Sequence, residues 1–144
     1  MPFSKKLSVG NRVLDSEHKK LFNIINEATR LITDKNIAAL VGTFELLEDS
    51  LCAYFAAEEN IAQAVDFDFT QHRLAHQDLL NEFRLLKNEL INKNGAWSKY
   101  HEKNYIDSLR DCLIQHIKED AKPFRIVLDT HLYDFKPDCI NACS

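Results

Sequence analysis

The chain has 144 residues, of which 45% are hydrophobic and 28% are charged, and its formal net charge at pH 7 is -4. These proportions are those of one folded domain with a single core, and they exclude a disordered chain. The sequence shows no basic stripe and no apolar run of about 20 residues, so we expect neither a nucleic-acid partner nor a membrane partner. Because the N-terminus lacks the apolar stretch of a signal peptide, we expect a cytoplasmic protein.

Glycine and proline are scarce, at three residues each. This scarcity argues against an all-β fold and against a glycine-rich phosphate loop, and it is typical of helices joined by short loops. The four cysteines contain no Cys-x-x-Cys pair, so a zinc ribbon is disfavoured and free thiols are expected. The composition therefore predicts an all-α protein.

The apolar periodicity predicts an antiparallel up-down-up-down four-helix bundle in a single domain, residues 1–144. The bundle occupies residues 14–122, between an irregular N-terminal arm at 1–13 and a short helical C-terminal extension at 123–144. Four helical patterns are expected, at 15–33, 37–65, 70–92 and 98–122. Asn94 and Gly95 mark the end of the third pattern, and Pro123 ends or kinks the fourth.

Metal-binding residue types lie on the apolar faces of all four predicted helices. The second helix carries a carboxylate, Glu58, in a stripe whose apolar residues are spaced by three and four. The third helix places His72 and His76 one above the other, because they are four residues apart. His18 lies near the start of the first helix and His116 near the end of the fourth. An antiparallel bundle brings all these positions to one pole.

A single histidine on an apolar face is usually a hydrogen-bonded core residue, and the pair in HRLAH alone is weak evidence. The combination differs, because a buried carboxylate among four imidazoles is costly unless a cation neutralises it. The layer therefore predicts a metal site. Tyr54, one turn before Glu58, is either a core aromatic, which we favour, or a phenolate ligand. Asp120, one turn after His116, is either a ligand or solvated.

The donor types limit the metal and its chemistry. Imidazole with carboxylate suits iron, zinc, manganese or nickel. HRLAH lacks the glutamate of a zinc-protease helix, and the chain has no Glu-x-x-His of the ferritin-like type. A carboxylate between two sets of histidines is suited to bridge two metals about 3.5–4 Å apart. His101 and His131 lie away from this layer and are expected at the surface.

Four segments resemble bacterial hemerythrins, in the same order and at nearly the family spacing: SVGNRVLDSEHKKLFNIIN, YFAAEEN, HRLAH and LIQHIKED. The resemblance covers roughly residues 3–125. It implies a four-helix bundle with non-heme iron, two ions joined by an oxo or hydroxo bridge, that binds dioxygen reversibly. It further implies that His72, His76 and His116 hold one iron. By the same resemblance, His18 lies on the other, oxygen-binding iron, and Glu58 bridges the two ions.

Two positions depart from the family pattern. Tyr54 stands where the family has a second histidine on the oxygen-binding iron, four residues before the bridging glutamate. Ala121 stands where the family has a bridging aspartate, five residues after the last histidine. Asp120 either replaces that aspartate through a local change in winding, or the second carboxylate bridge is absent. We therefore expect an altered second iron site.

The expected function is binding of dioxygen, or of another small diatomic or peroxide ligand, or sensing of oxygen or redox state. A metal- and oxygen-binding protein is favoured over an enzyme. The alternatives are a mononuclear iron or zinc module, a di-iron peroxidase-like enzyme, and a structural bundle that binds a partner through residues 135–144. A protein partner and a fused signalling domain remain open at this point.

Overall fold

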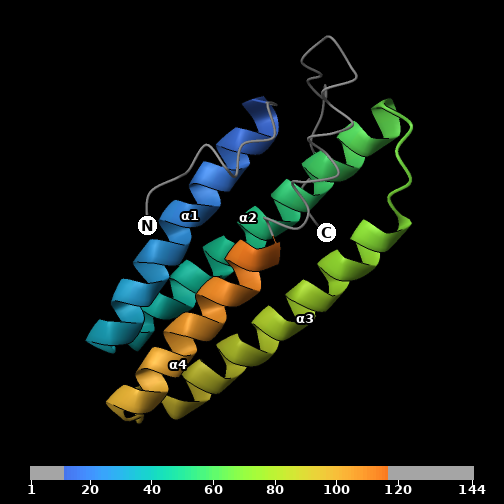
Figure 1. Ribbon diagram of the computed structural model, residues 1–144. Helices are drawn as coiled ribbons and strands as arrows, with labels where there is room; N and C mark the ends of the chain where they lie inside the picture. Colours follow the sequence, from blue (N-terminus) through green and yellow to red (C-terminus); the bar gives the residue numbers. More distant parts are fainter. Residues whose placement is uncertain (1–11, 117–144) are drawn as a thin grey trace.

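The computed structural model describes residues 12–116, which form an all-α, antiparallel, up-down-up-down four-helix bundle (Figure 1). The predicted fold class is confirmed. The last helix passes without a break into a short π-helical segment, η2. The elements are α1 (Arg12–Asp34), α2 (Ile37–Ala64), α3 (Thr70–Lys93), α4 (Lys99–Arg110) and η2 (Asp111–Gln115).

Two element boundaries differ from the sequence prediction. α1 begins at Arg12, so the last two residues assigned to the irregular arm belong to the helix. The fourth helix is not uniform, because its α-helical part ends at Arg110 and a π turn follows directly before His116. A π turn holds one residue more than an α turn, and apolar spacing alone does not reveal a single extra residue. The expected stretch from residue 117 to residue 122 lies outside the described residues.

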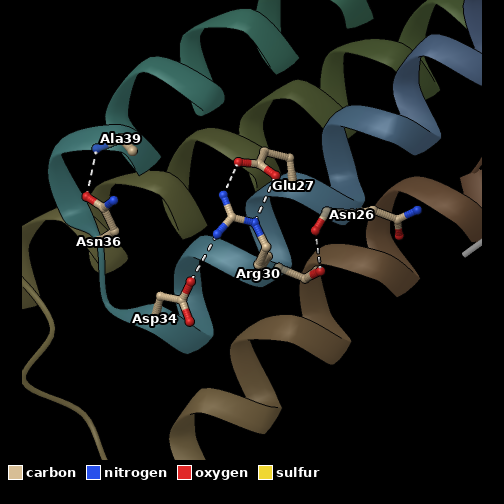
Figure 2. Close-up of polar contacts among 7 residues, drawn as sticks. Asn26, Glu27, Arg30, Asp34, Asn36 and Ala39 are labelled. Atoms are coloured by element: carbon tan, nitrogen blue, oxygen red, sulfur yellow. Dashed lines mark hydrogen bonds and ion pairs between the residues drawn. The ribbon is translucent and has the colours of Figure 1, made fainter.

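The joint between α1 and α2 is two residues long and is fixed by local hydrogen bonds (Figure 2). Asn36 caps α2, because its side-chain oxygen accepts a hydrogen bond from the backbone N–H of Ala39 at 3.3 Å. At the end of α1, the Arg30 guanidinium bridges Glu27 and Asp34, which lie one turn before and one turn after it. These contacts end one helix and begin the next within a few residues.

Each of the three joints has left-handed backbone near its beginning, and in the first joint this residue is Lys35 at φ 56°. The N–H of Phe67 donates to the carbonyl of Ala62 at 2.8 Å across the end of α2, with Asp66 at φ 56° between them. At the end of α3, Asn94 has φ 50° and Gly95 has φ 88°. The predicted stop at Asn94 and Gly95 is therefore confirmed. Short joints of this kind place consecutive helices side by side in antiparallel order.

The core forms where the apolar stripes of the four helices meet. In α2, the residues spaced by three and four from Leu40 to Ile61 are buried. Phe44 in this stripe packs edge-on against Phe83 of α3, with ring centroids 5.6 Å apart. Towards one pole the stripe changes from apolar residues to Tyr54 and Glu58, which stay buried. Within residues 12–116, no helix combines the length and the apolar character needed to cross a membrane.

Candidate metal centre

The start of α1, the end of α2 and the start of α3 lie towards the same end of the bundle, and η2 runs towards that end (Figure 1). Every predicted donor within the described residues lies there. His18 is 0% exposed, Glu58 is 1% exposed and His76 is 5% exposed, whereas His72 and His116 are partly buried. Asp120 and His131 lie outside the described residues. His101 is exposed near the start of α4, as predicted.

Glu58 and His76 make a direct polar contact between α2 and α3 at this pole. Nε2 of His76 lies 3.3 Å from Oε1 of Glu58, and both side chains are almost completely buried. An ionised carboxylate at such a depth costs free energy unless a positive group balances it. A protonated imidazole or a bound cation would supply that balance.

Tyr54 and His18 form a second contact, between α2 and α1. Their ring centroids are 4.8 Å apart with an interplanar angle of 56°, and Tyr54 is 1% exposed. Tyr54 precedes Glu58 by four residues on a continuous helix, so the two side chains lie on one face of α2. The altered position of the family pattern is therefore part of the buried pole, next to His18.

The remaining histidines adjoin His76. The ring of His116 lies 5.3 Å from the ring of His76, centroid to centroid. His72 lies one turn earlier on α3 and stacks on Phe69, which also contacts His76. The pole thus contains one group around His76 and a second group of His18 and Tyr54.

Sequence reasoning missed the role of two phenylalanines in this layer. Phe55 stacks on His76 with ring centroids 3.8 Å apart, and Phe69 stacks on His72 at 5.2 Å. Phe69 directly precedes α3, and Phe55 directly follows Tyr54. The sequence signal that could have indicated them is their position close to predicted ligands, Phe55 beside Tyr54 and Phe69 three residues before His72.

The donor set suits a metal, although its members adjoin in pairs. Within residues 12–116, no three histidine, cysteine or acidic side chains gather closely enough to hold one ion. The chemistry of the layer nevertheless fits iron, because imidazoles and a buried carboxylate are the ligands such an ion takes in helical bundles. To bind one ion together, these side chains must therefore come closer than their pairwise contacts bring them.

An antiparallel bundle with histidines and a carboxylate buried at one pole defines a class of helical metal-binding proteins. The family model described as Hemerythrin HHE cation binding domain matches residues 9–124, and the chain belongs to this family. Membership makes it a non-heme iron-binding protein.

Named relatives agree with this assignment. The chain is 24% identical over 131 residues to a bacteriohemerythrin of Pseudomonas aeruginosa, with 81% of this chain and 86% of the relative covered. It is 35% identical over 105 residues to a hemerythrin-like protein of Naegleria gruberi, with 64% of this chain and 83% of the relative covered. A hemerythrin-like protein of Naegleria fowleri matches to the same extent. No solved structure matches the chain.

Proposed function

We propose that this protein holds a carboxylate-bridged di-iron centre and binds dioxygen, or a similar small diatomic or peroxide ligand, as an oxygen or redox sensor. The observation that carries the proposal is the burial of Glu58 with a ligand-type side chain on each side. Nε2 of His76 in α3 lies 3.3 Å from Oε1 of Glu58. Tyr54 lies one turn before Glu58 in α2 and contacts His18. A carboxylate placed in this way is suited to join two ions.

The two halves of the centre would use different donors. His72, His76 and His116 would hold one iron, and Glu58 would bridge to the other. His18 would hold the second iron with Tyr54. Asp120, which lies outside the described residues, is the alternative extra ligand. Iron in such a centre supplies the electrons that allow dioxygen to bind.

Tyr54 favours sensing over reversible transport. A phenolate is a hard anionic donor and therefore stabilises ferric iron relative to ferrous iron. Reversible transport of dioxygen requires an accessible ferrous pair. With Tyr54 at the second iron, a reduced centre would be oxidised by dioxygen or peroxide in preference to releasing dioxygen unchanged, and its oxidation state would then report oxygen, peroxide or redox state.

The role of Tyr54 is tested by the visible spectrum of the ferric protein. A tyrosine bound to ferric iron gives a charge-transfer band, and we expect this band to disappear in Tyr54→Phe. Tyr105→Phe is the matched control, because Tyr105 is also buried but contacts Trp97 instead of the histidine layer. A Tyr54→Phe spectrum identical to that of the unmodified protein would show that Tyr54 is only a core aromatic.

A mononuclear iron or zinc site is the second candidate. It is favoured by the position of His76, which adjoins two other predicted donors, Glu58 and His116. The number and identity of the bound metals distinguish the two candidates.

A further inference from the structure

Five aromatic rings form a row across the three-histidine side of the pole. Phe69 contacts His72 and His76, with ring centroids 5.2 and 5.3 Å apart. Phe55 contacts His76 and His116, at 3.8 and 5.9 Å. Each phenylalanine therefore touches two histidines, and the order along the row is His72, Phe69, His76, Phe55, His116.

The ring planes show that the contacts fix orientation as well as position. Phe55 is nearly parallel to His76, with an interplanar angle of 9°, and Phe69 is nearly parallel to His72, with an angle of 18°. Both phenylalanines are 6% exposed. A histidine ring rotates broadly about its last side-chain torsion unless a neighbour restricts it. A parallel ring in contact restricts this rotation, because turning the imidazole would drive its edge into the phenyl face.

The backbone that carries Phe69 is itself fixed. In the joint between α2 and α3, the N–H of Phe67 donates to Ala62. The Asp68 carboxylate accepts hydrogen bonds from the backbone N–H and the hydroxyl of Thr70, at 3.1 and 2.9 Å. Phe67 also approaches His72 edge-on, with ring centroids 5.3 Å apart. These hydrogen bonds fix the position of Phe69, and they form within the chain without any metal ion.

We propose that Phe55 and Phe69 are positioning residues that restrain the ring planes of His72, His76 and His116 at the proposed metal site. Metal-bound histidines are usually oriented by a hydrogen bond to their second ring nitrogen. Ring stacking by Phe55 and Phe69 adds a restraint from the side of the imidazole. The inference rests on the proposed metal site, but it concerns how the three imidazoles are held whether or not the ion is present.

The first test is the rate at which the iron-loaded full chain loses iron to a chelator. Phe55→Leu and Phe69→Leu remove the rings and keep an apolar side chain. We expect iron affinity to fall by about 10- to 100-fold, the effect typical of losing a residue that orients a ligand, and iron loss to quicken accordingly. Phe69→Tyr, which keeps the ring, should restore the rate of the unmodified protein.

Phe83→Leu is the matched control. Phe83 is 1% exposed and its ring partner is Phe44, so this change also removes a buried phenyl ring but leaves the histidines untouched. Phe83→Leu should lower the thermal midpoint as the other two variants do, without quickening iron loss. Equal rates of iron loss in all three variants would show that Phe55 and Phe69 only fill the core, and would overturn the proposal.

A second test does not depend on iron. In the metal-free full chain, a phenyl face shifts the NMR signals of ring protons stacked on it to higher field. Phe69→Leu should remove this shift from His72, and Phe55→Leu should remove it from His76. If the unmodified chain takes up no iron, the proposed function fails, while this shift still decides whether the rings are held. Unshifted histidine protons in the unmodified chain would overturn the proposal.

Discussion

At the scale of single residues, Cys112 shows how the bundle suppresses the reactivity of a side chain close to the pole that carries the histidines. It lies four residues before His116, and its Sγ donates a hydrogen bond to Oε2 of Glu82 at 3.4 Å. Burial, with the neighbouring Glu82 carboxylate, raises the pKa of the Cys112 thiol to about 12 from its ordinary value of 9.0. The thiol therefore stays protonated at neutral pH.

We expect Cys112 to react slowly with iodoacetamide at pH 8. The thiolate is the reacting form, and it is about a thousand-fold scarcer in the folded chain than in the unfolded chain. Labelling is measured by mass spectrometry of the peptide that contains Cys112. Glu82→Gln should quicken the reaction, because it removes the negative charge beside the sulfur. Equal labelling rates in folded and unfolded protein would contradict this account.

The same pKa shift gives a direction for stability against pH. The pKa is higher in the folded state, so folding is favoured by this residue while the thiol is protonated in both states. As the pH rises from about 9 towards about 12, the unfolded chain loses the Cys112 proton first, and the free energy of unfolding falls. Cys112→Ser should reduce this loss of stability in the alkaline range.

At the scale of elements, the start of α2 depends on one side chain. The carbonyl oxygen of the Asn36 side chain accepts from the N–H of Ala39, an N–H that has no partner within the helix. We expect Asn36→Ala to lower the free energy of unfolding by about 0.5–1 kcal/mol, measured by urea denaturation.

The control for the cap is Asn88→Ala. Asn88 is exposed in the middle of α3, where alanine is the better helix former, so this change should leave stability equal or slightly higher. Similar losses in both variants would mean that the loss at Asn36 does not come from the cap.

The four helices could be predicted because each signal for them is local. α2 was predicted at 37–65 and is observed at Ile37–Ala64, since its long apolar stripe and its polar joints are explicit in the sequence. The end of α3 followed from Asn94 and Gly95, which adopt the left-handed backbone that these residue types favour. Local residue types were therefore sufficient for the element order.

The parts that sequence did not predict depend on contacts between elements or on single-residue winding. The π turn adds one residue just before His116 without changing the apolar pattern, and no residue type marks it. The sequence suggests a change in winding between His116 and Asp120, a stretch that lies outside the described residues from residue 117 on. The π turn that the structure describes lies before His116. The row of rings was missed because stacking of Phe55 on His76 depends on how α2 and α3 pack.

The candidate site was predicted as a layer, because helix order and antiparallel packing determine which residues share a pole. All five members of the layer were predicted to be buried. His18, Glu58 and His76 are buried, whereas His72 and His116 are only partly buried. Which donors touch one another was not predictable, since side-chain orientation depends on neighbours from other helices. The ligand roles of these residues remain predictions.

At the scale of the whole molecule, the pole opposite the histidines is closed by a contact between two joints. Nζ of Lys35 donates to the carbonyl of Trp97 at 3.0 Å and lies 5.8 Å from the centre of its ring. The Lys35 side chain also passes close to Gly95. This contact ties the joint after α1 to the joint after α3. This end of the bundle is therefore held independently of the pole that carries the histidines.

We expect Lys35→Met to lower the free energy of unfolding by about 1 kcal/mol, since it removes the hydrogen bond and the cation–π contact but keeps the apolar stem. Chemical denaturation measures the change. Lys103→Met, at an exposed position of α4, is the control and should have little effect. Iron content should be the same in both variants, because the contact lies at the opposite pole. Loss of iron in Lys35→Met would contradict this separation of the two poles.

The central claim is that the pole with His18, Glu58 and His76 holds two metal ions in spite of Tyr54. The most direct test is elemental analysis of the full chain, produced in iron-supplied cells and purified without a chelator. The account predicts about two irons per chain, because Glu58 has ligand-type side chains on both sides. About one metal per chain, or zinc in place of iron, would contradict it and would leave a mononuclear site at the three histidines.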